Sequence, residues 1–133
     1  MTSATTNALT APFTGDVSIL KPPGGPNIIS IQQASVQRKF VILLPNLNPD
    51  VYDLKSTYMS YTEKTGANDK SPRIWKGASG FLQVGPCAEG GMALRTVSDS
   101  VTLVGDSVLF QPLPGGSNTA AGDLLIGVGA KIQ

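Results

Sequence analysis

The stretch VSILKPPGGPNIISIQ, residues 17–32, places two short apolar runs on either side of a segment rich in proline and glycine. Proline fixes its own φ and glycine accepts conformations that other residues avoid, so KPPGGPN (residues 21–27) should form a rigid turn. A stronger apolar run, RKFVILL, follows at residues 38–44. Short apolar runs divided by such turns are typical of β-strands.

The same alternation continues to the end of the chain. Further apolar runs lie at residues 73–76, 80–84, 92–97, 101–104, 107–111 and 124–132. Many short runs separated by turns indicate a mainly β fold, either an antiparallel β-sandwich or a small barrel. Strands do not alternate with helices, so a parallel α/β fold is not expected. With 133 residues in all, we predict a single β-rich domain over residues 15–133.

The most specific local prediction is a β-hairpin in VTLVGDSVLF, residues 101–110. Glycine at the first central position of its two-residue loop suits a type II′ turn. Such a loop fixes the register, which would place Val101 opposite Phe110 and Leu103 opposite Val108. These four side chains would share one face of the hairpin, and that face should belong to the core.

One segment departs from the β pattern. Within residues 48–66, four large apolar or aromatic side chains recur at regular intervals: Val51, Leu54, Tyr58 and Tyr61. Their spacings of three, four and three follow the period of a helix. The Asn-Pro start and the glycine at the end suit the two ends of a helix. We predict one short helix over about residues 49–64, and a tyrosine-rich strand is the alternative.

The chain carries little charge. Charged residues make up 14% of the sequence and the net charge is +1, whereas about 25% is usual for soluble domains. Low charge leaves little self-repulsion, so association with other surfaces meets little electrostatic resistance. The alternative is a monomer whose surface consists of serine, threonine, asparagine and glutamine.

Residue types that carry catalysis or bind metals are scarce. The sequence has no histidine and one cysteine, Cys87, so Ser-His-Asp and Cys-His arrangements and an internal disulfide are excluded. The nearest charge to Cys87 is Glu89, which disfavours the reactive thiolate. Asp50 and Asp53 fit the first turn of the predicted helix better than an acid–base pair.

No other motif points to a cofactor. The carboxylates show no recognised metal-ligand spacing, and no glycine-rich segment has the sequence of a phosphate-binding loop. We therefore expect a protein that is not an enzyme and that uses neither a cofactor nor a metal.

The sequence also gives no sign of a membrane partner. Residues 1–11 lack the basic and apolar regions of a signal peptide. The longest apolar run, residues 40–45, is far too short to cross a bilayer.

The first dozen residues, MTSATTNALTAP, are small and polar, with Leu9 as their only large side chain. Such a segment buries too little apolar area to offset its ordering entropy, so we predict a flexible N-terminal arm over residues 1–14. The arm could become ordered against a partner, and a frayed terminus is the alternative.

Positive charge is unevenly distributed. Residues 38–76 contain seven basic and four acidic residues, a net +3, whereas residues 77–133 contain two basic and four acidic residues, a net −2. A net +3 over so long a stretch is modest, because affinity for phosphates rises with the number of cationic contacts. Nucleic acid is therefore an unlikely partner, and an ordinary solvated face is favoured.

The second half of the chain resembles a known family. The motifs are GFLQV (residues 80–84), GGMALRTV (residues 90–97), GDSVLF (residues 105–110) and AAGDLLIGVGAKI (residues 120–132). Their rhythm is similar to that of the small head-decoration, or cement, proteins of tailed bacteriophages, which are compact β domains with a flexible N-terminal arm. The likeness covers about fifty residues.

The resemblance implies a structural virion protein made in the host cytoplasm and placed on the capsid exterior. It further implies a homo-oligomer, commonly a homotrimer, that binds and stabilises an assembled capsid through the major capsid protein. The arm would add a strand to an exposed sheet edge on the shell. The residues expected to form this capsid-binding arm are Thr2, Ser3, Thr5, Thr6, Leu9 and Phe13.

Two other functions remain open on the sequence. The first is a small self-assembling coat protein, with Arg38, Lys39 and Lys55 facing the genome. The second is a carbohydrate-binding β module, with Trp75 and Tyr58 as stacking platforms.

Overall fold

The computed structural model describes residues 2–6, 13–33, 38–64, 68, 70, 72–99, 107–115, 118, 120 and 122–132. Eleven β-strands lie within these residues and none of them forms a helix. The strands are β1 (Thr2–Thr6), β2 (Phe13–Leu20), β3 (Asn27–Gln32), β4 (Arg38–Leu44), β5 (Asp50–Asp53), β6 (Met59–Glu63), β7 (Arg73–Ser79), β8 (Phe81–Pro86), β9 (Met92–Val97), β10 (Val108–Pro112) and β11 (Leu124–Lys131).

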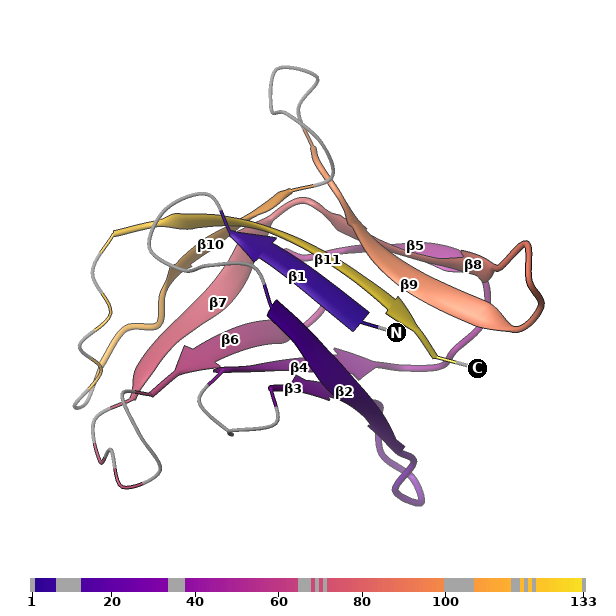
Figure 1. The fold of residues 1–133 in the computed structure, drawn as a ribbon, viewed down its shortest axis with the longest axis horizontal. Coiled ribbons are helices and arrows are strands. Elements are labelled where there is room, and N and C mark those ends of the chain that lie inside the picture. Colours follow the sequence, from indigo (N-terminus) through magenta and orange to yellow (C-terminus); the bar gives the residue numbers. More distant parts are fainter. Residues whose placement is uncertain are drawn as a thin grey trace.

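All strand pairs are antiparallel, which confirms the mainly β fold of a sandwich or small barrel. Eight strands follow one another in the order β1-β2-β3-β4-β6-β7-β10-β11, and β1 also pairs with β11, so this circuit closes. Strands β9, β8 and β5 extend from the second half of β11 as a three-stranded flap (Figure 1).

The core lies inside this circuit and beneath the flap. Side chains alternate along each strand, and the inward positions of β3, β4 and β11 are the buried ones. Four aromatic rings fill the centre. The centroids of Phe40 and Tyr61 are 4.8 Å apart, those of Tyr61 and Trp75 are 5.7 Å apart, and those of Phe40 and Phe110 are 6.2 Å apart.

The predicted helix over residues 49–64 is wrong. The segment forms β5, a tight turn and β6, with β5 paired to β8 and β6 held between β4 and β7. The Asp53 carbonyl accepts the N–H groups of Ser56 and Thr57, and its carboxylate accepts the N–H of Lys55. Because this turn separates two short strands, the apolar residues of β5 and β6 do not continue one alternating pattern. Taken together, these residues have the spacing of a helix.

The predicted hairpin is half outside the described residues, because residues 101–106 are not among them. Val108 and Phe110 are buried, as expected for core positions. The register that sets Val101 opposite Phe110 is wrong, because Phe110 pairs with Gly77 of β7 on one side and with Leu124 of β11 on the other. Both edges of β10 are thus occupied by other strands.

Candidate assembly surfaces

Most of the residues predicted to form the capsid-binding arm lie at the closure of the circuit. Thr2, Ser3, Thr5 and Thr6 belong to β1, Phe13 is the first residue of β2, and Leu9 lies outside the described residues. Strand β1 makes four residue pairs with β11, from Ser3↔Gly129 to Thr6↔Ile126, and three pairs with β2. Strand β1 lies between β2 and β11 (Figure 1). The sequence predicted a flexible arm for the same residues.

The backbone of β1 pairs with a strand on each side. Its sequence, TSATT, contains no large apolar side chain. Each backbone hydrogen bond contributes about 1 kcal/mol, whereas ordering each of its five residues costs about 1–2 kcal/mol. These terms are of similar size, so backbone pairing alone would give β1 only a marginal association with its neighbours.

Strand β11 has two glycines opposite β1. On β11, Gly127 and Gly129 face away from the core opposite Thr5 and Ser3. A Cβ atom added to Gly129 would have no heavy atom within 4 Å, so open space lies beside it. This side of β11 therefore presents backbone with few side chains.

A second surface lies on the side of β2, β3, β4 and β6 that faces away from the core, which we call the outer face. Cross-strand pairing arranges its side chains in three rows. An apolar row comprises Leu20, Ile28, Leu43 and Tyr58. A middle row comprises Ser18, Ser30, Val41 and Ser60. A polar row comprises Asp16, Gln32, Lys39 and Thr62.

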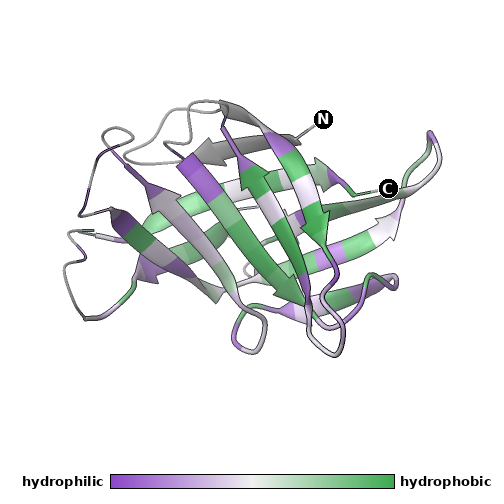
Figure 2. Ribbon diagram, turned by 90° about the horizontal axis from the view of Figure 1, so that it is seen from below, coloured by the Kyte–Doolittle hydropathy of each residue, from purple (hydrophilic) through white to green (hydrophobic). Residues whose placement is uncertain are grey.

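The apolar row includes two of the large hydrophobic side chains that are most exposed among the described residues. Leu20 is 62% exposed and Tyr58 is 37% exposed. The Lys76 ammonium lies 6.0 Å from the centroid of the Tyr58 ring, at the limit of a cation–π contact. Figure 2 views the molecule from the side on which these strands lie, and shows their hydrophobic stretches next to one another.

The sequence of β4 indicates that both of its sides are covered, although the prediction of strands above did not rest on this feature. In RKFVILL both sides of the strand are apolar: Phe40 and Ile42 are buried, and Val41 and Leu43 lie half-buried on the outer face. A strand with one solvated side usually alternates apolar and polar residues, and a continuous apolar run is typical of a strand covered on both sides.

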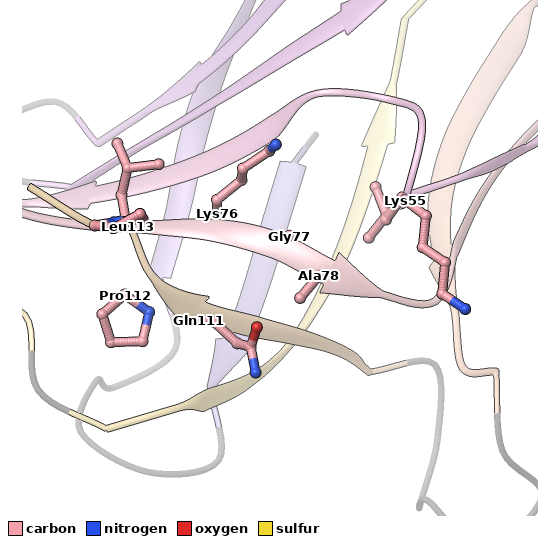
Figure 3. Close-up of a pocket in the computed structure, with 9 residues that line it drawn as sticks. Lys55, Lys76, Gly77, Ala78, Gln111, Pro112 and Leu113 are labelled. Atoms are coloured by element: carbon pink, nitrogen blue, oxygen red, sulfur yellow. The ribbon is translucent and has the colours of Figure 1, made fainter.

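A shallow pocket of about 320 Å³ lies between the turn after β5, the end of β7 and β10 (Figure 3). A β-bulge at Ala78 shapes it, because Ser79 pairs with Leu109 while Gly77 pairs with Phe110. Its polar groups come from Lys55, Lys76 and Gln111, and its other lining is apolar. None of the lining side chains is a carboxylate, thiol or hydroxyl.

Cys87 and Asp50 take part in local hydrogen bonds of the backbone. Half-buried Cys87 lies in a tight turn, where its N–H donates to the Gly91 carbonyl and its own carbonyl accepts the Gly90 N–H. The Asp50 carboxylate accepts the N–H of Val51 at 2.7 Å, on the strand that ends the flap. Among the described residues, no group of histidine, cysteine, aspartate and glutamate side chains could hold a metal ion.

Burial and a neighbouring carboxylate both act on the hydroxyl of Tyr52. Desolvation raises the pKa of its hydroxyl above the usual value, and the nearby Asp50 carboxylate raises it further. The hydroxyl donates to Asn46 Oδ1 at 3.1 Å and lies 3.2 Å from the Asn48 carbonyl. Tyr52 therefore fastens the loop before β5 and stays protonated well above neutral pH.

The residues predicted for each of the two alternative functions do not lie together at one site. Trp75 is buried, and its Nε1 donates to the Gly122 carbonyl at 2.9 Å, whereas Tyr58 lies on the outer face. The two rings thus form no common stacking platform. Arg38 and Lys39 are adjacent in β4 and so point to opposite sides of it, and Lys55 lies in the turn after β5.

Comparisons of the chain with protein-family models, with curated proteins and with solved structures find no match. Within the described part of the chain there is no helix with the length and apolarity needed to span a membrane.

Proposed function

We propose that this protein is a structural virion protein that binds an assembled capsid from outside and stabilises it as a decoration protein. Its partners in this proposal are the major capsid protein and further copies of itself, in the trimer that the resemblance to phage cement proteins implies. The low charge of the chain and its exposed apolar row support a role in assembly.

The observation that carries the proposal is the backbone pairing of β1, a strand whose sequence has no large apolar side chain. A strand with no large apolar side chain in its sequence can leave β2 and β11 and form the same kind of backbone bonds with a sheet edge of a capsid subunit. Main-chain pairing supplies the affinity, so the Thr/Ser/Ala sequence of the strand needs no large side chain.

Transfer of β1 need not unfold the donor. The buried hydrophobic core is formed by residues of β3, β4, β6, β7, β8, β9, β10 and β11, with Leu54 and Ile132 beside them. Val17 and Ile19 of β2 pack against its margin. The described core therefore stays assembled when β1 exchanges one edge for another.

Co-sedimentation tests the function. The purified chain, mixed with shells assembled from the major capsid protein proposed as its partner, should pellet with the shells in a saturable manner. Alone, it should stay a small oligomer in the supernatant. Failure to pellet with shells would contradict the proposal. Formation of shells by the chain alone would identify a coat protein instead.

A further inference from the structure

The pocket between the turn after β5, the end of β7 and β10 carries positive charge that no carboxylate of its lining balances. Lys55 and Lys76 are both exposed at its rim, and neither ammonium group forms an ion pair with a described residue. The Asp53 carboxylate accepts the backbone N–H of Lys55 at 2.9 Å, which holds it in the turn. The Tyr58 ring, at 6.0 Å from the Lys76 ammonium, is at the limit of a cation–π contact and leaves that charge unbalanced.

The walls of this pocket are apolar and held in place by the fold. Leu54 is buried, and its Cδ1 would lie 3.2 Å from a Cβ atom added to Gly77. Residues 112–114 form another wall, where two prolines fix φ and the Leu113 N–H donates to the Ile74 carbonyl at 3.0 Å. Charges of one sign beside walls of low dielectric constant focus the electric field and concentrate ions of the opposite sign. The pocket is therefore suited to an anion.

Strand β10 adds a neutral hydrogen-bond donor beside one of the lysines. Gln111 pairs with Lys76 across β10 and β7, so the two side chains stand on the same side of the sheet, with about 5 Å between their Cβ atoms. Their N–H groups can therefore donate to one bound acceptor. The β-bulge leaves Ala78 without a partner in β10, and Lys55 approaches the same pocket from the turn after β5 (Figure 3).

We propose that this pocket binds the carboxylate of a glutamate side chain presented by a protein partner. The carboxylate would accept hydrogen bonds from Lys76 and Gln111, and the apolar stem of the glutamate would contact Leu54 and Pro112. Sites for free small molecules enclose most of the surface of their ligand, which a shallow pocket cannot do. The occupant is therefore a side chain whose own protein covers the mouth of the pocket.

This inference deepens the proposed function and rests on it for the identity of the partner, which would be the major capsid protein. The pocket would then recognise an acidic residue of the shell at a site separate from β1. The lining comes from the turn after β5, from β7 and from β10 with the residues that follow it, whereas β1 pairs with β2 and β11. The test uses the isolated protein and a small probe without shells, so failure of the pocket is distinguishable from failure of capsid binding.

Titration of the full chain with N-acetyl-glutamate N-methylamide, followed by nuclear magnetic resonance at constant ionic strength, tests the site. The probe should shift the backbone amide resonances of Lys76, Gly77 and Gln111 in a saturable manner, with a Kd in the millimolar range. N-acetyl-glutamine N-methylamide has nearly the same shape without the charge, and should give no saturable shift. Equal effects of the two probes, or no saturable shift with the glutamate probe, would overturn the proposal.

Three matched substitutions locate the charge that the probe recognises. Lys55→Gln and Lys76→Gln each remove one positive charge from the rim, whereas Lys21→Gln removes one from the turn after β2. All three side chains are exposed, so the substitutions leave the core unchanged. Each rim variant should bind the glutamate probe about two- to fivefold more weakly, as expected for the loss of an exposed ion pair, and Lys21→Gln should bind it like the wild type. An equal loss in all three variants, or no loss in the rim variants, would overturn the assignment of the pocket.

Discussion

Gly80 joins β7 to β8 and turns the chain from the closed circuit into the flap. Its φ is 122°, a conformation that residues with a side chain rarely adopt. A Cβ atom at this position would lie 2.8 Å from Cβ of Val108, whose side chain is buried. Both the backbone conformation and the space available therefore require glycine.

Gly80→Ala should destabilise the fold by more than about 2 kcal/mol, because strain in φ and a clash with a core side chain add together. Gly85→Ala in β8 is the matched control, since an added Cβ would meet nothing within 4 Å there. Urea unfolding of the two variants measures the difference. Equal midpoints would show that the close approach of Gly80 to Val108 is wrong.

Phe110 contributes a ring to the centre of the core, where it is fully buried and packs edge-on against Phe40. Phe110→Ala should cost roughly 3–5 kcal/mol, because it removes the ring and leaves a cavity. Denaturant unfolding would show this as a lower midpoint at an unchanged slope. A loss below about 1 kcal/mol would contradict the burial.

At the scale of the element, the strands were the features most readily predicted. The runs at residues 28–32, 38–44, 92–97 and 124–132 all became strands, because proline and glycine mark their ends and their apolar residues face one core. The order of the strands was not predictable, because pairing between distant segments leaves no local signal. The continuous apolar run of β4 signals that its outer side is apolar, but the rows of the outer face could not be predicted, since they exist only after β2, β3, β4 and β6 align.

The segment that forms β5 and β6 shows why periodicity can mislead. A four-residue strand is too short to display its own period, and the turn at Asp53 changes the phase before β6 begins. Asp50 and Asp53 suited a helix start, but their carboxylates accept backbone N–H groups at the strand end and in the turn. A carboxylate that accepts a nearby backbone N–H group occurs both at the start of a helix and in a turn, so these two residues fit either structure.

Strand β1 yields a prediction about the stability of the isolated protein. If residues 1–14 formed the flexible arm that the sequence predicts, removal of residues 1–12 would leave the melting temperature nearly unchanged. In the structure, backbone pairing of β1 roughly balances its ordering cost, so the truncated protein should melt less than about 5 °C below the full chain. Thermal melting followed by circular dichroism checks this. Unfolding on truncation would show that β1 belongs to the core.

At the scale of the whole molecule, the structure presents two surfaces with different physical character. The site of β1 offers backbone hydrogen bonds and little apolar area, whereas the outer face offers apolar and polar rows. In the proposed function the first surface engages the shell.

The most direct test of this account is the binding of two single variants in β1 to shells of the major capsid protein. Ala4→Pro removes a backbone donor and fixes φ in the middle of the strand, whereas Ala4→Ser keeps the backbone as it is. Co-sedimentation should show binding of Ala4→Ser close to that of the wild type and a loss of at least about tenfold for Ala4→Pro. Equal binding of both variants would contradict the role of β1 in attachment.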